Sequence, residues 1–369
     1  MEIAFRTDAS LQIGSGHVMR CLTLAEALRD RGATCRFICR EHPGNLLAQI
    51  RTRGFVALAL PVLMTDDDQR PQPCEPVHRN WLGSSWQADA EQTLDLLQGV
   101  RPDWLIVDHY ALDRRWEDAV RPASGALMAI DDLADRLHAC DLLLDQNLGR
   151  TPQDYVDLVP APCQILAGPR YALLRPQFAQ LRGYSLARRT ANAPLTNILI
   201  AMGGVDQANA TTSVLQTLRD GVLLPGNCGI TIIMGAQAPW LRDVVDFAAR
   251  LPWHAEIAIG VDDMARRMAE SDLAIGAAGG TAWERCCLGL PALLAVLAQN
   301  QWPGARALQA SGASRLLGEV ADIPQRLGPE LALLMQEGAL QRMSRLASAI
   351  TDGLGVARVS EILEGHARH

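Results

Sequence analysis

The chain has 369 residues and a mass of 40.0 kDa, which predicts two domains because a domain commonly holds about 150 residues. Apolar residues make up 49% of the sequence and charged residues 20%, and these ordinary globular values exclude a disordered or fibrous chain. The net charge of -7 comes without a basic stripe, which argues against nucleic acid as the main partner.

Three features of the sequence bear on where the protein works. The longest apolar run, Leu290–Ala298, is far shorter than the roughly 18 residues that a membrane span needs. The first residues enter a strand pattern directly, without the basic and apolar regions of a signal peptide. The nine cysteines show no paired spacing, so a cytosolic chain would keep them reduced. We expect a cytoplasmic protein that acts on a small molecule; the sequence carries no signal for its oligomeric state.

Short apolar runs alternate with amphipathic stretches along the first half of the chain. This alternation is typical of βαβ units, in which a parallel sheet carries helices on both faces. The predicted strands are Glu2–Arg6, Thr34–Cys39, Val56–Leu60, Trp104–Asp108, Ala126–Ile130 and Asp141–Leu144. The predicted helices are His17–Arg31, Asn45–Arg53, Trp86–Leu97 and Arg114–Val120. The segment Met64–Ser85, with three consecutive aspartates and several prolines, is expected to be a long surface loop.

The alternation restarts after a polar stretch at Arg182–Leu195, which we interpret as a linker. The predicted strands beyond it are Asn197–Met202, Ile230–Met234, Glu256–Ile259, Leu273–Gly276 and Ala292–Val296, with helices such as Ala210–Arg219, Asp262–Glu270 and the helical C-terminal part Pro324–Gly365. The sequence therefore predicts an α/β protein with two doubly wound domains, at residues 1–185 and 192–369. Ligands of such sheets bind beyond the carboxyl ends of the strands, so residues that follow a strand are the candidates for function.

Two glycines, Gly14 and Gly16, stand between the first predicted strand and the first helix. Such a turn allows close approach of a ligand to the backbone, and the free N–H groups of the helix start favour an anion. The turn could instead belong to a dinucleotide fingerprint, with Glu41 near the position of the ribose-binding acid. Met19 occupies the place of the third glycine of that fingerprint, which weakens this alternative without removing it.

His17 falls in the first turn of that helix, where the helix dipole disfavours a charged imidazole. The same field should hold the ring neutral and able to accept a proton. A lone histidine is more often a packing or capping residue, but the position after Gly-Ser-Gly at the end of a strand favours a catalytic role. The sequence predicts that His17 is a general base.

Acidic side chains follow several other strands of the first domain. They are Asp8 after the first strand, Asp108–Tyr110 after the fourth, Asp131–Asp132 after the fifth and Asp145 after the sixth. Each alone could belong to a turn or cap a helix, but together they indicate a polar pocket. Tyr110 could contact the ring of a ligand or be an ordinary half-buried tyrosine.

Small residues follow two strands of the second domain. Gly203 and Gly204 follow one strand, and Gly279, Gly280 and Thr281 follow another and lead into a helix. Backbone N–H groups at the start of a helix, with no side chains in the way, are what a diphosphate needs. We expect the second domain to bind a nucleotide here.

Glu284 and Asn300 each have two interpretations. Glu284 could complete a capping box with Thr281, which the spacing alone favours, or accept hydrogen bonds from a ribose. Asn300 could cap a helix or contact the substrate. Cys286 and Cys287 are adjacent, so their side chains diverge and no protein metal site is expected. No cofactor is required by the sequence, although Mg²⁺ could accompany a diphosphate.

Five motifs occur along the chain in this order: Asp8–Ser10 with Gly14–Cys21, Asp108–Tyr110, Met202–Asp206, Gly279–Pro291 and Asn300–Gln301. Together they resemble the UDP-sugar hydrolases of the pseudaminic-acid pathway, over roughly Met1 to Ser311. The resemblance implies a GT-B-like fold, in which two Rossmann-like domains face a central cleft. It also implies hydrolysis of UDP-2,4-diacetamido-2,4,6-trideoxy-β-L-altropyranose by water, with inversion, to UDP and 2,4-diacetamido-2,4,6-trideoxy-L-altrose in pseudaminic acid biosynthesis.

The resemblance also implies roles for single residues. His17 matches the histidine that activates water, and Asp8 is implied only as a residue of the cleft. Tyr110 and Asn300 match positions that line the sugar side. Gly279, Gly280 and Thr281 match the diphosphate-binding turn, and Glu284 matches a ribose contact, in preference to the capping box. Gly14, Gly16, Gly203 and Gly204 complete the predicted substrate contacts.

Three other functions fit the same motifs. A glycosyltransferase would use the same fold and a UDP-sugar donor, with a sugar acceptor in place of water. A nicotinamide-dependent enzyme would use the turn at Gly14–Gly16. A sensor would bind the UDP-sugar and leave it intact. Product analysis without an acceptor separates the first from a hydrolase, and binding of NAD(P) or UDP separates the second.

Overall fold

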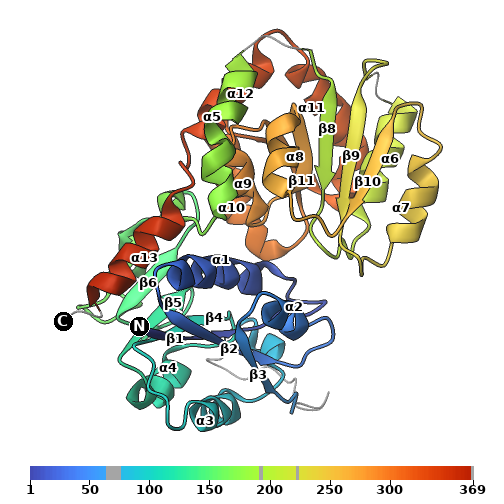
Figure 1. Cartoon of the computed structure of the whole chain (residues 1–369). Coiled ribbons are helices and arrows are strands. Elements are labelled where there is room, and N and C mark those ends of the chain that lie inside the picture. Colours follow the sequence, from blue (N-terminus) through green and yellow to red (C-terminus); the bar gives the residue numbers. More distant parts are fainter. Residues whose placement is uncertain (64–75, 191–193, 222–223, 367–369) are drawn as a thin grey trace. The chain divides into compact units, whose positions relative to one another are not determined.

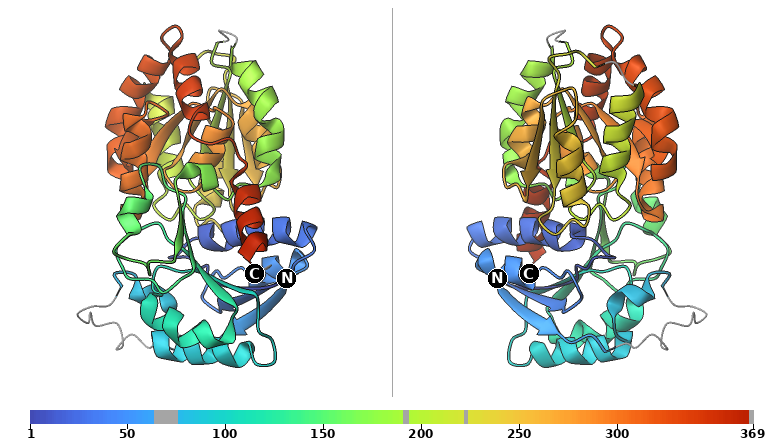
Figure 2. Two further views of the ribbon diagram at one scale, coloured as in Figure 1. Left: turned by 90° about the vertical axis from the view of Figure 1, so that its left-hand side faces the viewer. Right: turned by 90° about the vertical axis from the view of Figure 1, so that its right-hand side faces the viewer.

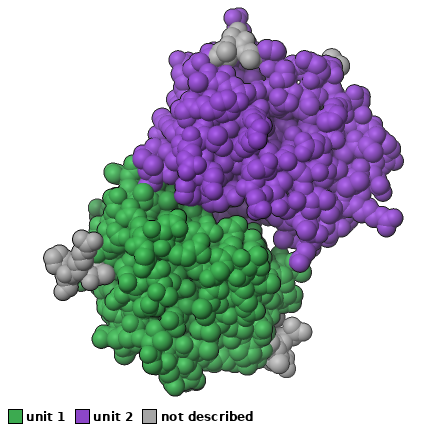
Figure 3. Space-filling view, in the orientation of Figure 1, with its two compact units in different colours: residues 1–173, 355–369 green, residues 174–354 purple. Residues whose placement is uncertain are grey.

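The computed structural model describes residues 1–63, 76–190, 194–221 and 224–366 (Figure 1). The chain divides into two compact units, with residues 1–173 and 355–369 in unit 1 and residues 174–354 in unit 2 (Figure 3). Among the described residues, none of the helices combines the length and the apolar character that crossing a membrane requires.

The core of unit 1 is a parallel sheet of seven strands in the order β3-β2-β1-β4-β5-β6-β7. The strands are β1 (Glu2–Thr7), β2 (Thr34–Arg40), β3 (Val56–Leu60), β4 (Trp104–Asp108), β5 (Ala126–Ile130), β6 (Leu142–Asp145) and β7 (Gln164–Ala167). The central strands are buried along nearly their whole length, as expected when helices cover both faces of a parallel sheet.

Helices cover both faces of this sheet. The helices are α1 (Gly16–Asp30), α2 (Leu47–Thr52), α3 (Trp86–Leu96), α4 (Arg114–Val120) and α13 (Gly355–His366), with short 3₁₀ turns η2 (Arg79–Leu82), η3 (Arg121–Ala123), η4 (Pro152–Tyr155) and η5 (Pro169–Tyr171). Apolar residues of α1, α2 and α13 share one core cluster, and those of α3 and α4 share another. The two ends of the chain therefore lie close together in unit 1 (Figures 1 and 2).

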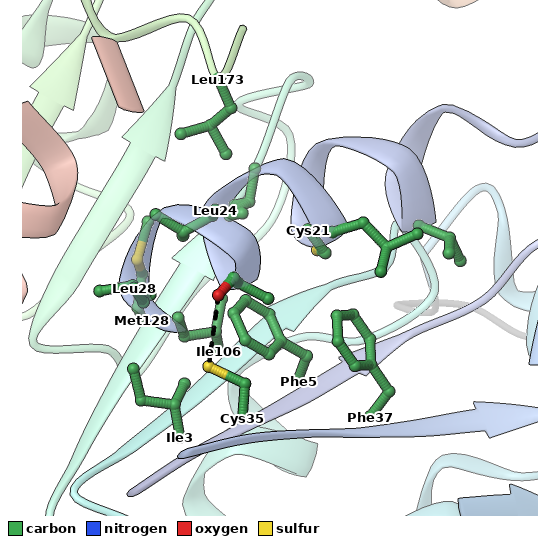
Figure 4. Packing of buried hydrophobic residues seen from close by; sticks show 14 of the residues in the cluster. Ile3, Phe5, Cys21, Leu24, Leu28, Cys35, Phe37, Ile106, Met128 and Leu173 are labelled. Atoms are coloured by element: carbon green, nitrogen blue, oxygen red, sulfur yellow. Dashed lines mark hydrogen bonds between the residues drawn. The ribbon is translucent and has the colours of Figure 1, made fainter. Parts of the chain in front are cut away.

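Aromatic stacking anchors the core beneath α1. Phe5 and Phe37, on neighbouring strands, stack with ring centroids 4.9 Å apart. Leu24 of α1 packs in the same cluster, and the Cys35 thiol donates a hydrogen bond to the carbonyl of Ala25 (Figure 4). This packing fixes α1 on the sheet and so fixes the position of its first turn, where His17 lies.

The core of unit 2 is a second parallel sheet, of six strands in the order β10-β9-β8-β11-β12-β13. The strands are β8 (Asn197–Ala201), β9 (Gly229–Met234), β10 (Ala255–Ile259), β11 (Leu273–Ala277), β12 (Ala292–Val296) and β13 (Arg315–Glu319). The helices are α5 (Pro176–Thr190), α6 (Ala210–Gly221), α7 (Leu241–Ala248), α8 (Met264–Glu270), α9 (Thr281–Cys287), α10 (Trp302–Ala310), α11 (Ile323–Leu334) and α12 (Ala339–Ser348), with 3₁₀ turns η6 (Gln299–Gln301) and η7 (Val320–Asp322).

The division of the chain differs from the expected domains, residues 1–185 and 192–369. Unit 2 begins at Leu174 because α5, predicted in part as a linker, packs on it: the buried Arg189 guanidinium donates to the backbone carbonyls of Ser271 and Leu288. The chain then returns to unit 1 at its end, because α13 packs on α1 and the Trp104 indole donates to the carbonyl of Leu363 at 3.1 Å. The C-terminal helix therefore belongs to the first unit and not to the second.

The structure adds to two other expectations, one for a loop and one for the number of strands. The expected loop Met64–Ser85 is only partly described: residues 64–75 lie outside the described residues, and Arg79–Leu82 form the turn η2. The strands β7 and β13 were not predicted from the sequence. Both strands lie at an edge of their sheets. Gln164 at the start of β7 and Glu319 at the end of β13 are exposed, so neither strand has the long apolar run of a central strand.

Both sheets change winding direction at one place. In unit 1 this switch point lies between β1 and β4, and in unit 2 it lies between β8 and β11. Ligands of doubly wound sheets bind beyond the carboxyl ends of the strands at such a point. The fold therefore directs attention to the segments that follow these four strands, which carry most of the residues predicted from the sequence.

Candidate active site

His17 and Asp108 form a hydrogen-bonded pair at the switch point of unit 1. His17 lies in the first turn of α1, and Asp108 ends β4. The His17 Nδ1 atom is 2.6 Å from the Asp108 Oδ1 atom. A carboxylate only accepts hydrogen bonds, so a neutral His17 carries its proton on Nδ1. Nε2 then keeps a free lone pair and has no hydrogen-bond partner among the described residues, which is the tautomer that a general base needs.

Arg20 holds the Asp108 carboxylate in place. Its Nε and Nη2 atoms donate to Oδ2 and Oδ1 of Asp108 at 2.6 and 2.7 Å, a bidentate pair of strong, charge-assisted hydrogen bonds. Burial alone would raise the pKa of the Asp108 carboxyl, but Arg20 and His17 lower this pKa well below its ordinary value. Asp108 is therefore ionised at neutral pH and orients the imidazole of His17.

Asp132 extends this network by one further layer. Its Oδ2 atom accepts hydrogen bonds from Arg20 Nη1 at 2.7 Å and from the Tyr110 hydroxyl at 2.6 Å, and its Oδ1 atom accepts from Asn147 Nδ2 at 2.9 Å. The Tyr110 ring stands edge-on to the His17 ring, with centroids 4.5 Å apart. The predicted residue Tyr110 therefore lies beside His17, with its hydroxyl already engaged.

The acids predicted to form one polar pocket fall into two groups that Asn147 joins, because its Nδ2 atom donates to Asp132 Oδ1 at 2.9 Å and to Asp145 Oδ1 at 2.8 Å. Asp108 and Asp132 lie in the network around His17. Asp131 and Asp145 instead accept hydrogen bonds from the buried Tyr155 hydroxyl at 2.9 and 2.8 Å. These two aspartates hold the loops behind the sheet together and do not contact His17.

Asp8 does not line an open site as the sequence predicts. Its side chain is fully buried, and its Oδ1 atom accepts from Arg6 Nη1 and from the Arg40 backbone N–H, both at 2.6 Å. Its Oδ2 atom faces Nε2 of His109 at 3.3 Å and of His42 at 3.8 Å. The physical reason is Arg6, which points into the protein from β1 and needs a buried counter-charge. Asp8 supports the strand ends beneath the site.

The turn before α1 leaves its backbone open. Gly14 has a φ of +80°, a left-handed conformation that favours glycine. The Ser10 hydroxyl accepts a hydrogen bond from the N–H of Ile13 at 2.9 Å and so shapes the turn. A Cβ atom at Gly14 or Gly16 would have no atom within 4 Å. The structure thus brings these two glycines into open space next to His17, where a ligand could approach the chain.

Backbone turns dominate the corresponding edge of unit 2. Gly203, with a φ of +91°, and Gly204 follow β8, while Gly279 and Gly280 follow β11, its neighbour in the sheet. A Cβ atom at Gly280 would have no atom within 4 Å. The helix α9 begins at Thr281, and its first N–H groups have no capping side chain. The N–H groups of Ala282 and Trp283 already donate to the carbonyls of Gly279 and Gly280, so within the described residues those of Gly280 and Thr281 are the ones available to bind an anion such as a diphosphate.

The capping alternatives for Glu284 and Asn300 are not realised. The residue that caps α9 is Gly280 rather than Thr281, so the predicted capping box does not form. Glu284 Oε1 lies 3.9 Å from Arg175 Nη2, and burial raises the pKa of the Glu284 carboxyl. Asn300 lies within η6 and does not cap α10. Both side chains therefore remain candidates for ligand contacts.

Arg285 is a buried cation beneath the glycine turn that sequence reasoning missed. It is 1% exposed, its Nη2 atom donates to the Ala277 carbonyl at 2.6 Å, and its Nε and Nη1 atoms find no partner among the described residues. Burial lowers the pKa of Arg285 to about 10, so it keeps its charge at neutral pH. A charged residue at a buried helix position of the motif Gly279–Pro291 was the available signal.

The missed residues of unit 1 had weaker signals. Arg20 lies three residues after His17, a spacing that places both on one side of α1. Asp132 was expected in the polar pocket from its place after β5, but it meets Arg20 across 112 residues of chain, a pairing that no local pattern predicts, and Asn147 joins the network through Asp132. Across the described residues, no three His, Cys, Asp or Glu side chains gather in a way that would hold a metal ion.

Solved structures identify the class of fold. The structure of MurG from Acinetobacter baumannii covers 99% of both chains with a TM-score of 0.68 at 15% identity. The glycotransferase of kitacinnamycin covers 99% of this chain and 98% of its own with a TM-score of 0.63, also at 15% identity. The chain therefore has the GT-B fold of glycosyltransferases, made of two Rossmann-like units, as the sequence predicts.

Within that class, the curated relatives confirm the resemblance that the motifs predicted. The chain is 26% identical over 272 residues to the UDP-2,4-diacetamido-2,4,6-trideoxy-beta-L-altropyranose hydrolase of Campylobacter jejuni, a match that covers 74% of this chain and 83% of that one. It is 28% identical over 204 residues to the spore coat polysaccharide biosynthesis protein SpsG of Bacillus subtilis, covering 54% and 58%.

A third relative is the uncharacterized protein MJ1062 of Methanocaldococcus jannaschii, 25% identical over 306 residues. That match covers 82% of this chain but 56% of the relative, so the chain spans little more than half the length of that protein. No family model matches the chain.

Proposed function

We propose that this protein hydrolyses a UDP-sugar, and that the sugar nucleotide is UDP-2,4-diacetamido-2,4,6-trideoxy-β-L-altropyranose. The observation that carries the proposal is the His17–Asp108 pair, in which the carboxylate engages Nδ1 and leaves Nε2 to face a water molecule in the first turn of α1. The similarity to the Campylobacter jejuni hydrolase supports the choice of substrate. In the same proposal the protein works in the cytoplasm, in pseudaminic acid biosynthesis.

The proposed reaction needs one proton acceptor. A water molecule bonded to His17 Nε2 attacks the anomeric carbon and passes a proton to that nitrogen. A bond forms between the water oxygen and the carbon, and the bond from the carbon to the UDP oxygen breaks. Attack opposite the leaving group inverts the configuration. General-base assistance of this kind contributes typically 10²–10⁴-fold to a rate.

Asp108 and Arg20 fix the orientation of the His17 imidazole. The ionised Asp108 holds Nδ1–H and stabilises the imidazolium that forms when Nε2 takes the proton. Because Arg20 binds both Asp108 oxygens, the carboxylate cannot rotate away from the ring. The Tyr110 ring, which stands edge-on to the His17 ring, restricts the movement of that imidazole. The base is therefore held in one orientation before substrate arrives, which saves reorganisation during the reaction.

The proposed leaving group is bound by unit 2. The N–H groups of Gly280 and Thr281 donate hydrogen bonds to the diphosphate oxygens, and the buried charge of Arg285 stabilises the negative charge that grows on UDP. The Glu284 carboxylate takes the ribose hydroxyls, and Asn300 contacts the sugar. We propose that activity does not require Mg²⁺. If Mg²⁺ nevertheless accompanies the diphosphate, chelation with EDTA will lower the affinity of the protein for UDP.

Product analysis tests the proposal. Purified protein is incubated with UDP-2,4-diacetamido-2,4,6-trideoxy-β-L-altropyranose in the absence of any acceptor, and UDP and free sugar are measured. The proposal predicts equal amounts of both products. A strict requirement for a sugar acceptor would indicate a glycosyltransferase, and binding of the intact substrate without any product would indicate a sensor.

A further inference from the structure

Two cysteine thiols of unit 1 are in contact at the start of neighbouring strands. Cys140 lies two residues before β6, and Cys163 directly precedes β7, which pairs with β6 at the edge of the sheet. The Sγ atoms of the two residues are 3.7 Å apart, and both thiols are free. The proposed function assigns no role to either side chain.

Hydrogen bonds of the adjacent residues hold the two thiols next to each other. The N–H of Gln164, which follows Cys163, donates to the carbonyl of Asp141, which follows Cys140, at 2.9 Å. Asp141 is itself fixed, because its carboxylate pairs with Arg121. A disulfide has its sulfur atoms about 2.05 Å apart, so these two sulfurs need to approach by only about 1.7 Å. Rotation of the two side chains supplies a movement of this size while β6 and β7 stay paired.

The two thiols differ in their access to solvent. Cys163 is half-buried, so a small oxidant in solution reaches its sulfur, whereas Cys140 is only 2% exposed. The hydrogen bond with Cys163 and burial both raise the pKa of the Cys140 thiol, which keeps this thiol protonated. Because oxidants react with exposed cysteines first, Cys163 is the thiol that an oxidant meets, and Cys140 is the neighbour that can resolve the product.

We propose that Cys140 and Cys163 are a redox-sensitive pair, which a peroxide converts to a disulfide that ties β6 to the edge strand β7 and stabilises unit 1. With hydrogen peroxide, the Cys163 thiolate attacks one oxygen and the O–O bond breaks. Cys163 becomes a sulfenic acid, and the departing hydroxide takes up the proton that Cys163 lost, which gives water.

The second step forms the disulfide. The Cys140 sulfur attacks the Cys163 sulfur, the S–O bond breaks, and a second water molecule leaves with the Cys140 proton. Two thiols are thus oxidised, and one hydrogen peroxide is reduced to two water molecules. The disulfide remains open to small thiols at the half-buried Cys163, so thiol–disulfide exchange restores the reduced pair.

The disulfide would stabilise the outer part of the sheet. The two cysteines are 23 residues apart in the chain, so the bond closes a loop in the unfolded chain and lowers its conformational entropy. The loop includes β6 and ends at β7, which has a neighbouring strand on one side only. Both cysteines lie at the amino ends of their strands, opposite the carboxyl ends that carry His17 and Asp108. The pair can therefore act whatever reaction the protein catalyses.

Peptide mapping tests the pair directly. The reduced full chain is treated with hydrogen peroxide, its remaining thiols are blocked with N-ethylmaleimide, and it is digested without reductant for mass spectrometry. We expect a cross-linked pair of peptides that contain Cys140 and Cys163 and are lighter than the two thiol peptides together by two hydrogen atoms. The melting temperature should rise by about 5 °C on oxidation and return to its first value after treatment with dithiothreitol.

Three variants identify the residues involved. Cys163→Ser should abolish both the cross-link and the rise in melting temperature. Cys140→Ser should leave Cys163 as a sulfenic acid, which dimedone traps to a greater extent than in the unchanged protein. Cys228→Ser is the matched control and should change neither result: Cys228 directly precedes β9, and its thiol donates to the carbonyl of the next residue at 3.7 Å, as that of Cys163 does at 3.6 Å.

The melting temperature of each reduced variant is measured first, so that an effect on folding is distinguished from an effect on oxidation. Recovery of Cys163 as a sulfinic acid, or joined to any thiol other than that of Cys140, overturns the proposal. A cross-link between Cys140 and Cys163 without any rise in the melting temperature overturns its stabilising role. Release of UDP from a UDP-sugar is not part of this test, so its result is independent of the proposed function.

Discussion

The switch points of the two units have the same topology but carry different groups: polar side chains in unit 1 and glycine turns in unit 2. In unit 1 the strand ends carry a connected set of buried charged side chains, from His17 through Asp108 and Arg20 to Asp132. In unit 2 the corresponding ends are glycine turns with open backbone N–H groups. The proposed function assigns a proton acceptor to the first unit and an anion site to the second, so the residues at the strand ends, and not the topology, distinguish the two.

Because only unit 1 carries this charge network, substitutions at its switch point should lower folding stability more than substitutions in the glycine turns of unit 2. Arg20 carries the charge that balances the buried Asp108 carboxylate, so loss of Arg20 leaves a buried charge uncompensated. Breaking a buried ion pair in this way typically costs about 3–5 kcal/mol. A glycine turn holds no such charge, and its substitutions should act on ligand binding more than on folding.

Removing the base should have the largest effect. His17→Asn cannot accept the proton from water, so kcat should fall by roughly 10²–10⁴-fold. In the proposed function UDP binds through residues of unit 2, so its dissociation constant should change by less than about twofold. Steady-state kinetics and calorimetry on the same preparation measure the two quantities. His254→Asn, at an exposed position of unit 2, is the matched control and should change neither. An equal loss of turnover and of UDP affinity would contradict the division of labour.

Replacing the partner of the base should have the next largest effect. Asp108→Asn loses the carboxylate that holds Nδ1–H, so part of His17 adopts the wrong tautomer, and kcat should fall by about 10²-fold or more. The same change leaves the Arg20 guanidinium with Asp132 alone as its counter-charge, so the melting temperature should fall as well. Kinetics and thermal melting give the two readouts. Full activity in a protein with lowered stability would show that Asp108 is only structural.

A pair of glycine substitutions should separate binding from folding in unit 2. At Gly280 a Cβ atom meets only open space, so Gly280→Ala should fold normally but obstruct the diphosphate and weaken UDP binding by about 10-fold. At Gly276 the Cβ atom would lie 2.7 Å from the Ala201 carbonyl oxygen, so Gly276→Ala should lower the melting temperature. Calorimetry and thermal melting distinguish them. Normal UDP binding by Gly280→Ala would remove the diphosphate from this turn.

Acid should destabilise unit 1 before unit 2. The pKa values of Asp108, Asp131 and Asp89 are lowered in the folded protein, because the arginines beside them outweigh burial. Carboxyls of this kind stabilise the fold above their unfolded pKa of about 3.9, and this contribution is lost as the pH falls below it. Burial raises the pKa values of Asp206 and Glu284 in unit 2, which has the opposite sign.

Hydrogen exchange of the full chain, followed by mass spectrometry between pH 5 and roughly pH 3, measures this difference. Peptides of β1 and β4 should lose protection at a higher pH than peptides of β8 and β11. Loss of protection in both sheets at the same pH would show that the charge network does not set the acid stability of unit 1.

The same contrast explains what could be predicted from the sequence. The central strands and most helices follow from local apolar patterns, and the position of His17 and of the glycine turns follows from residues adjacent to a strand. Asp132 was expected in the polar pocket, but its pairing with Arg20 could not be assigned in advance, because the two residues lie far apart along the chain. Asp8 was misplaced for the same reason: nothing near it shows that Arg6 points inward.

The unit boundaries illustrate a further limit. The polar residues of Arg182–Leu195 are typical of a linker, but Arg182 and Arg189 of α5 bond to backbone carbonyls of unit 2. The return of α13 to unit 1 depends on contacts between the two ends of the chain. Periodicity predicts that such segments are helices, while only the packing shows which sheet they cover.

Labelling the oxygen of water tests most directly whether water attacks the anomeric carbon. Hydrolysis of UDP-2,4-diacetamido-2,4,6-trideoxy-β-L-altropyranose is run in ¹⁸O-labelled water without an acceptor, and both products are weighed by mass spectrometry. If His17 Nε2 directs water to the anomeric carbon, the label enters the free sugar at its first time point and UDP stays unlabelled. Label in UDP would mean attack at phosphorus, and would contradict the role given to His17.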